Sequence, residues 1–95
     1  MNKLEFRDIQ LDLDQKLCII SGSTINLTKI EYELLLFFLK HKNKIFSRQE
    51  LLNEVWKSKV TLRTVDTTVS RLRKKLGKME TYITTRLGFG YGFIE

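Results

Sequence analysis

The residues with the clearest chemical capacity lie in one basic segment, residues 57–78. This segment holds eight Lys and Arg side chains and a single acid, Asp66. Residues 1–56, by contrast, carry eight cations and eight acids. The formal net charge of +6 is therefore concentrated in one part of the chain. Such a local positive field attracts polyanions, nucleic acid first and an anionic membrane surface second.

Residues 63–76 of this segment have the spacing of a helix with one buried face. At about 100° per residue, four apolar side chains fall within about 60° of a helical wheel: Val65, Val69, Leu72 and Leu76. The opposite side presents short hydroxyls and long cations, which are Arg63, Thr67, Ser70, Arg71 and Lys74. Short side chains allow a close approach, arginine can pair with a guanine edge, and the other cations can bind phosphates. This face therefore predicts contact with the major groove of DNA.

Two other readings of the basic face are open at this stage. It could be a solvated surface, or the docking face of a protein-interaction module that binds an acidic partner. An enzyme is not expected, because no nucleophile–base set or phosphate-binding loop is visible. His41 and Cys18 are each the only residue of their type, so we expect no metal site, no cofactor and no disulfide. A reducing, cytoplasmic location and no membrane partner are expected, since no apolar run approaches the ~20 residues of a membrane span.

The elements that must position this helix can be read along the chain. Short antiparallel strands are expected within residues 4–27, where Ile9, Leu11 and Leu13 alternate with polar residues. Two capping boxes, Thr28–Glu31 and Ser47–Glu50, predict helices that run to about residues 41 and 56. Residues 57–62 form a basic loop, the third helix covers about residues 63–76, and Gly77 ends it. Strands at 82–85 and 91–94 then form a hairpin. The fold class is α+β, a winged helix-turn-helix in one domain, residues 1–95.

Three single residues of these elements carry specific expectations. Asp66, the only acid near the basic surface, is expected to pair with Arg63 or Ser70 at the helix start. Trp56 is expected in the core. Tyr91 is expected either to pack under the hairpin or to touch phosphate, and the structural role is favoured.

Three blocks of the sequence resemble a known family: LTKIEYELLLFFLKHKNKIFSRQELLNEVW, RTVDTTVSRLRKKLG and ITTRLGFGYGF. Over about residues 4–94 they are similar to the winged-helix effector domain of OmpR/PhoB-type response regulators. The resemblance implies a four-stranded N-terminal sheet, three helices and a C-terminal hairpin, the wing. It implies sequence-specific binding to double-stranded promoter DNA, with the third helix in the major groove and hairpin 82–94 in the minor groove. It also implies a second protomer on tandem half-sites, a contact of loop 57–62 with RNA polymerase, and an N-terminal receiver domain outside these 95 residues.

The resemblance also implies roles for single residues. Base-reading positions are Thr67, Thr68 and Arg71, phosphate-binding positions are Arg63, Thr64, Ser70, Arg73 and Lys74, and the wing contributes Thr85 and Arg86. The wing departs from the family pattern, because Leu87 stands where an arginine is frequent and Arg86 precedes it. Adjacent strand residues point to opposite faces, so Arg86 is expected to reach the minor groove only if the hairpin is bulged or shifted.

Overall fold

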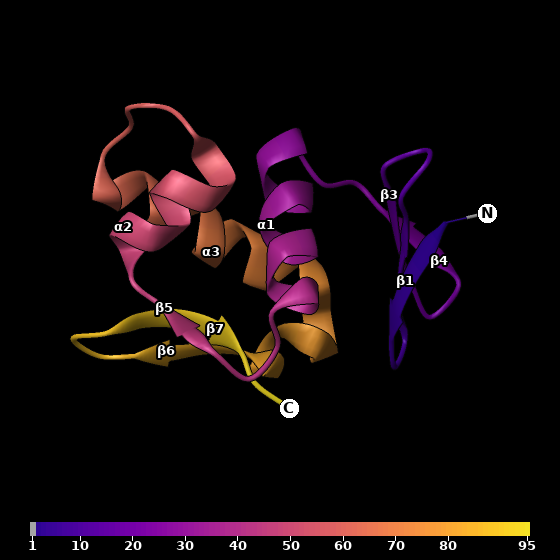
Figure 1. The fold of residues 1–95 in the computed structure, drawn as a ribbon. Coiled ribbons are helices and arrows are strands. Elements are labelled where there is room, and N and C mark those ends of the chain that lie inside the picture. The colour runs from indigo at the N-terminus through magenta and orange to yellow at the C-terminus, as the bar shows by residue number, and fades with distance from the viewer. Residues whose placement is uncertain (1) are drawn as a thin grey trace.

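The computed structural model describes residues 2–95 and confirms the α+β architecture. Helix α1 (Lys29–Lys40) lies between a four-stranded sheet and a unit that contains α2, α3 and the C-terminal hairpin, as Figure 1 shows. Most of the basic segment therefore lies on the side of α1 away from the N-terminal sheet, and the last turns of α3 pass behind α1 in Figure 1. This separation leaves the outward side of α3 uncovered by the rest of the chain.

The N-terminal sheet is an antiparallel meander in the order β1-β2-β3-β4. Its strands are β1 (Lys3–Phe6), β2 (Ile9–Asp12), β3 (Leu17–Ile20) and β4 (Ser23–Ile25). Ile9 and Leu11 are fully buried, whereas Gln10 and Asp12 are half-buried, as their alternation predicts. Cys18 pairs with Leu11 across the sheet and is buried. Burial raises the pKa of the Cys18 thiol to about 11.

Both predicted capping boxes are present. At the start of α1, the Thr28 N–H donates to Glu31 Oε1 at 2.9 Å, and the Glu31 N–H donates to Thr28 Oγ1 at 3.3 Å. The Ser47–Glu50 box starts α2 (Arg48–Leu51) in the same way, with distances of 2.8 and 3.0 Å. These reciprocal bonds satisfy two N–H groups that a helix otherwise leaves unpaired.

The second helix differs from the single α-helix expected up to residue 56. After Leu51 it continues as a π-helical segment, η1 (Leu52–Trp56), and the Lys57 N–H donates to the Leu52 carbonyl at 2.8 Å. Lys57 has the left-handed conformation with φ +56°, which ends the helix. The wider turn buries Leu52 and Val55 but leaves Trp56 only half-buried. Trp56 therefore packs against the core as expected, but from a half-buried position.

The predicted hairpin is present and belongs to a second sheet, in which an additional strand, not predicted, precedes the start of α2. Its order is β5-β7-β6, with β5 (Ile45–Phe46), β6 (Ile83–Arg86) and β7 (Gly90–Phe93). Two glycines of β7 permit the close approach of β5. A Cβ atom on Gly90 would overlap the Phe46 carbonyl, and one on Gly92 would overlap the Lys44 carbonyl.

The third helix, α3 (Leu62–Leu76), confirms the predicted apolar stripe. Val65, Val69, Leu72 and Leu76 are at most 2% exposed. Gly77, with φ +58°, ends α3 as predicted. A 3₁₀ segment, η2 (Gly77–Tyr82), which the sequence did not indicate, then leads into β6.

One buried ion pair connects α1 with α3. Lys75 Nζ donates to Glu31 Oε1 at 2.6 Å, and Glu31 is 2% exposed. Burial by itself raises the pKa of the Glu31 carboxyl, but the hydrogen bonds from Lys75 and Thr28 outweigh it and lower the pKa below 4.5. A carboxyl whose pKa is lower in the folded state stabilises the fold above the unfolded pKa. That stability is lost as the pH falls through the folded pKa.

We expect Glu31→Gln to reduce the acid sensitivity of the fold. Glutamine retains the capping box but cannot titrate. Between pH 7 and pH 3 the free energy of unfolding should fall by about 1 kcal/mol less in the variant than in the parent, a modest figure because Lys75 remains partly exposed. Urea unfolding at both pH values measures this difference. Glu33→Gln, on the same helix, is the control, and equal pH dependence in Glu31→Gln and the parent would contradict the prediction.

Candidate nucleic-acid interface

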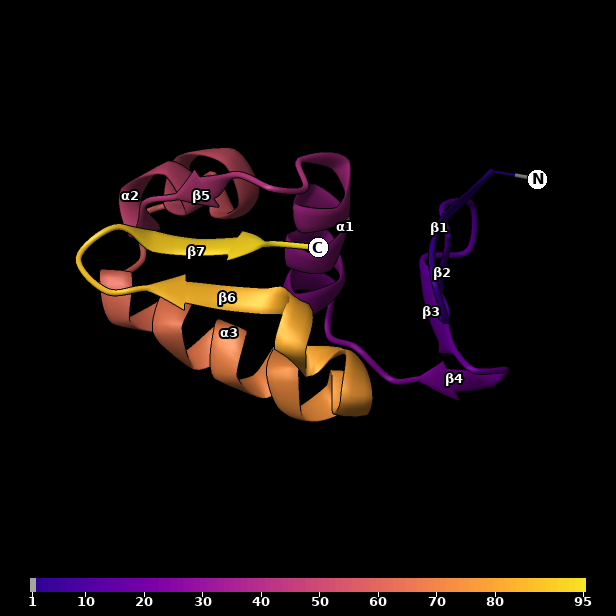
Figure 2. The same ribbon diagram turned by 90° about the horizontal axis from the view of Figure 1, so that it is seen from below.

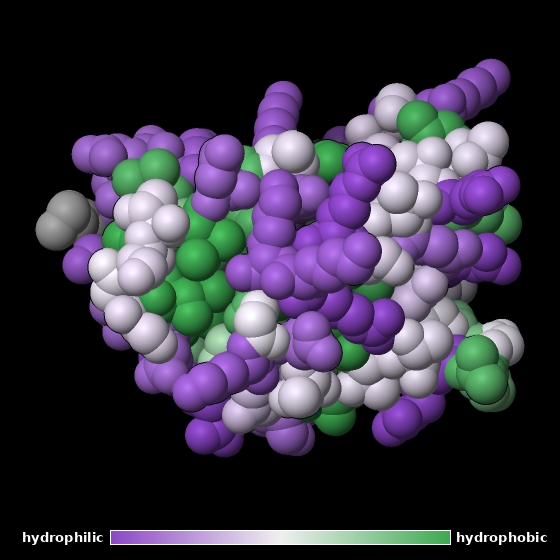
Figure 3. Space-filling view, turned by 180° about the vertical axis from the view of Figure 1, so that it is seen from behind, coloured by the Kyte–Doolittle hydropathy of each residue, from purple (hydrophilic) through white to green (hydrophobic). Residues whose placement is uncertain are grey.

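The outward face of α3 presents the side chains that its helical wheel predicts. Arg63, Thr67, Ser70, Arg71 and Lys74 are all exposed. The three cations among them take part in none of the three ion pairs formed within residues 2–95. Figure 3 views the molecule from behind, the side on which α3 lies, and shows hydrophilic side chains projecting from the centre of this face. The cations are therefore free to meet an external polyanion.

Thr68 does not belong to this exposed face. It is 7% exposed, and its hydroxyl donates to the Thr64 carbonyl at 2.9 Å. The reason is its angular position, one residue before Val69, at the edge of the buried stripe. We therefore correct the expectation that Thr68 reads a base. Thr67 donates to the Arg63 carbonyl at 3.1 Å, but its side chain remains exposed.

Arg73 binds the hairpin instead of pointing freely outward. Its Nε and Nη2 atoms donate to the Ile83 carbonyl at 3.2 and 2.8 Å, and Nη2 also donates to Thr85 Oγ1 at 2.6 Å. Its guanidinium carbon lies 5.8 Å from the centre of the Tyr91 ring. These contacts engage two of the guanidinium nitrogens in fixing β6 against α3. Arg73 and Thr85 therefore have a positioning role within the fold, and the phosphate contact of Arg73 and the DNA contact of Thr85 stay predictions.

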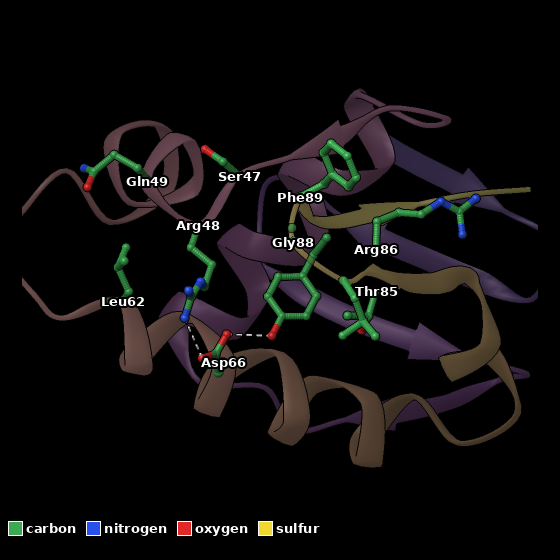
Figure 4. Close-up of a pocket in the computed structure, with 12 residues that line it drawn as sticks. Ser47, Arg48, Gln49, Leu62, Asp66, Thr85, Arg86, Gly88 and Phe89 are labelled. Carbon is green, nitrogen blue, oxygen red and sulfur yellow. Dashed lines mark hydrogen bonds and ion pairs between the residues drawn. The ribbon is translucent and has the colours of Figure 1, made fainter.

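Asp66 connects α3 with both α2 and the hairpin. Arg48 Nη1 donates to Asp66 Oδ2 at 3.2 Å, and the Tyr91 hydroxyl donates to Asp66 Oδ1 at 2.6 Å, as the dashed lines in Figure 4 show. The expected partners, Arg63 and Ser70, were wrong, because residue 66 faces the groove between α2 and the wing. Burial, followed by the hydrogen bond to Asp66, raises the pKa of Tyr91 to about 12. The structural role expected for Tyr91 is confirmed.

The hairpin has no bulge, and its regular pairing determines the face on which the Arg86 side chain lies. Its pairs run from Ile83↔Phe93 to Arg86↔Gly90 without a bulge. Thr85 faces α3, since it bonds Arg73, so the adjacent Arg86 lies on the opposite face. In Figure 4 the Arg86 side chain extends away from Asp66. The bulge or shift on which the predicted minor-groove contact of Arg86 depended is absent from this hairpin.

The wing loop projects beside the N-terminal end of α3, as Figure 2 shows. A groove of about 450 Å³ separates the loop from the first turns of α2 and α3. Its lining includes Arg48, Leu62, Asp66, Leu87 and Phe89. The groove therefore lies between the wing and the starts of α2 and α3, and the outward-facing residues of α3 are not part of its lining.

The arrangement of α2, α3 and the hairpin defines the class of this domain. Within residues 2–95 no three His, Cys, Asp or Glu side chains gather as a metal site requires. In the same residues, no helix is long and apolar enough to cross a membrane. Two helices joined by a short loop, the second basic and outward-facing, are followed by a hairpin bonded to that helix. This geometry defines a winged helix-turn-helix domain.

Comparison with known proteins identifies the family within this class. The family described as "Transcriptional regulatory protein, C terminal" matches residues 22–93, and the chain belongs to it. The transcriptional regulatory protein SrrA of Staphylococcus aureus is 42% identical over 96 residues, which cover 95% of this chain. The chain spans 40% of the length of SrrA.

Solved structures agree with the fold. The Thermotoga maritima response regulator DrrB, an OmpR/PhoB homolog, is 33% identical with a TM-score of 0.86, covering 98% of this chain and 44% of DrrB. The DNA-binding domain of the response regulator AdeR, solved in complex with an intercistronic region, is 32% identical with a TM-score of 0.87. That match covers 97% of this chain and 99% of the AdeR domain.

We expect Tyr91→Phe to loosen the wing. The change removes the hydroxyl that binds Asp66 and should lower the free energy of unfolding by about 1 kcal/mol. Amides of β7 should also exchange faster with solvent. Urea unfolding and hydrogen exchange measure the two effects. Tyr82→Phe, which removes a hydroxyl from the neighbouring cluster of Phe6 and Phe93, is the control. A Tyr91→Phe variant as stable as the parent would refute the role assigned to this bond.

Proposed function

We propose that this chain binds double-stranded DNA sequence-specifically, as the output domain of a two-component response regulator. In this proposal α3 enters the major groove and the wing lies along the adjacent minor groove. The observation that supports it most directly is that the cations of α3 fall into two groups, those bound within the fold and those left exposed. Arg73 and Lys75 are held by intramolecular partners, whereas the exposed face keeps its cations available.

The roles of single residues follow from their positions on that face. Arg71 is exposed beside Thr67, so these two residues are proposed to read base edges, with arginine pairing to guanine. Arg63, Ser70 and Lys74 are proposed to bind phosphates and fix the register. Thr64, which is half-buried in the first turn, is proposed to bind phosphate near the helix N-terminus.

Two findings from relatives support the proposal. The AdeR domain was crystallised with DNA, and its fold matches this chain over nearly its whole length. SrrA, at 42% identity, is a transcriptional regulatory protein. A receiver domain N-terminal to this one, tandem binding of two protomers to promoter half-sites, and a contact of loop 57–62 with RNA polymerase stay predictions from the family resemblance.

Substitutions at Arg71 and Lys74 distinguish base reading from phosphate binding. Selection from a randomised duplex pool first gives the preferred site. Arg71→Ala should then weaken binding by about 1–3 kcal/mol and relax the preference at one base position. Lys74→Ala should weaken all sequences alike and reduce the slope of log K against log salt by about one. Titrations of both variants at several salt concentrations measure these effects.

The competing interpretation is a module that docks an acidic protein partner. Its basic face would bind duplexes with a steep salt dependence but without an enriched motif. In that case Arg71→Ala and Lys74→Ala would have equal effects on every duplex. Lys3→Ala, on the exposed strand β1 beyond α1, is the matched control for loss of one surface charge.

A further inference from the structure

The wing loop carries two large apolar side chains that the fold leaves in water. Leu87 is 90% exposed and Phe89 is 75% exposed, whereas the other exposed large hydrophobic residues in the described chain lie at 37–38%. Figure 3 shows hydrophobic atoms protruding at the lower right, where the hairpin ends. Leu87 and Phe89 flank Gly88 and together form what we call the apolar tip.

The apolar tip is held out by fixed geometry. The Phe89 N–H donates to the Arg86 carbonyl at 2.9 Å, which closes a tight turn. Gly88, at φ +83°, supplies the left-handed conformation at the third residue of this turn. Below the loop, the hydrogen bonds of Thr85 and Tyr91 fix both strands of the hairpin to α3. The tip therefore projects at a set position relative to the DNA-facing side of α3.

We propose that Leu87 and Phe89 act as an apolar wedge that enters the minor groove and partly unstacks a base step. This inference rests on the proposed function. Side chains that open minor-groove steps and kink DNA are apolar, including Phe and Leu. Arg86, the cation nearest the tip, lies on the hairpin face opposite Thr85, so the part of the wing that projects farthest is uncharged.

DNA is the occupant that the surroundings of the tip favour. The tip lies at the end of a hairpin whose strands are bonded to α3, the helix that carries the exposed cations Arg63, Arg71 and Lys74. An arginine in the wing would seek the negative potential of a narrow A-tract groove. A wedge instead favours steps that unstack easily, which are pyrimidine–purine steps such as TA. The wing is therefore expected to prefer DNA sequences that deform easily at the step it enters.

The test uses the duplex that the chain selects, in two versions that differ only at the step facing the wing, TA or AA. For the parent chain we expect roughly tenfold tighter binding to the TA version, comparable with one altered base pair. We also expect a DNA bend, measured by energy transfer between dyes at the duplex ends. The double variant Leu87→Ala, Phe89→Ala should lose both the step preference and the bend, while it retains the base preference set by Arg71.

Two controls separate the possible failures. Leu17→Ala, at an exposed leucine of β3, should leave bend and preference unchanged, and circular dichroism verifies that each variant is folded. A double variant that keeps the bend and the TA preference would overturn the wedge. A double variant with normal DNA bending that no longer assembles with a second copy on tandem sites would also overturn it, and would assign the tip to a protein contact. If the parent chain selects no duplex at all, the proposed function fails before the wedge is tested.

Discussion

The carboxylate of Asp66 links α3 to two other elements at once. Arg48 approaches it from α2 and the Tyr91 hydroxyl from β7. A single acid within a strongly basic segment thus connects α3 with helix α2 and with the wing. Because Asp66 uses both oxygens for these contacts, it is not available to neutralise the cations on the outward face. Asp66 therefore helps to orient α3 without reducing the positive charge of its outward face.

The parts of this fold that could be predicted depend on interactions close in sequence. Capping boxes join residues three positions apart, and the buried stripe of α3 repeats every three or four residues. Both can be recognised without knowing what lies across the core. The two boxes at Thr28 and Ser47 and the exposure of Arg63, Arg71 and Lys74 followed from such local spacing.

The parts that could not be predicted depend on partners distant in sequence. Arg73 meets β6 ten residues later, and Asp66 meets Arg48 eighteen residues earlier. Both partners lie outside α3, so a helical wheel of α3 cannot reveal these contacts. Strand β5 is only two residues long, and it forms because Gly90 leaves room for the Phe46 backbone. Thr68 was assigned outward from the family pattern, although its wheel position beside the buried stripe could have indicated its burial.

The close approach of β5 to β7 limits the positions at which this domain can accept amino-acid substitutions. Residues 90 and 92 have no room for a side chain, so substitutions there disturb the frame that carries the hairpin. Leu87 and Phe89 meet no such constraint, because both side chains are exposed, whereas Gly88 is constrained by its φ of +83°. New combinations of side chains can therefore be exchanged at this loop while the scaffold is inherited unchanged. Regulators that share this frame can diverge in what their wings recognise through very few mutations.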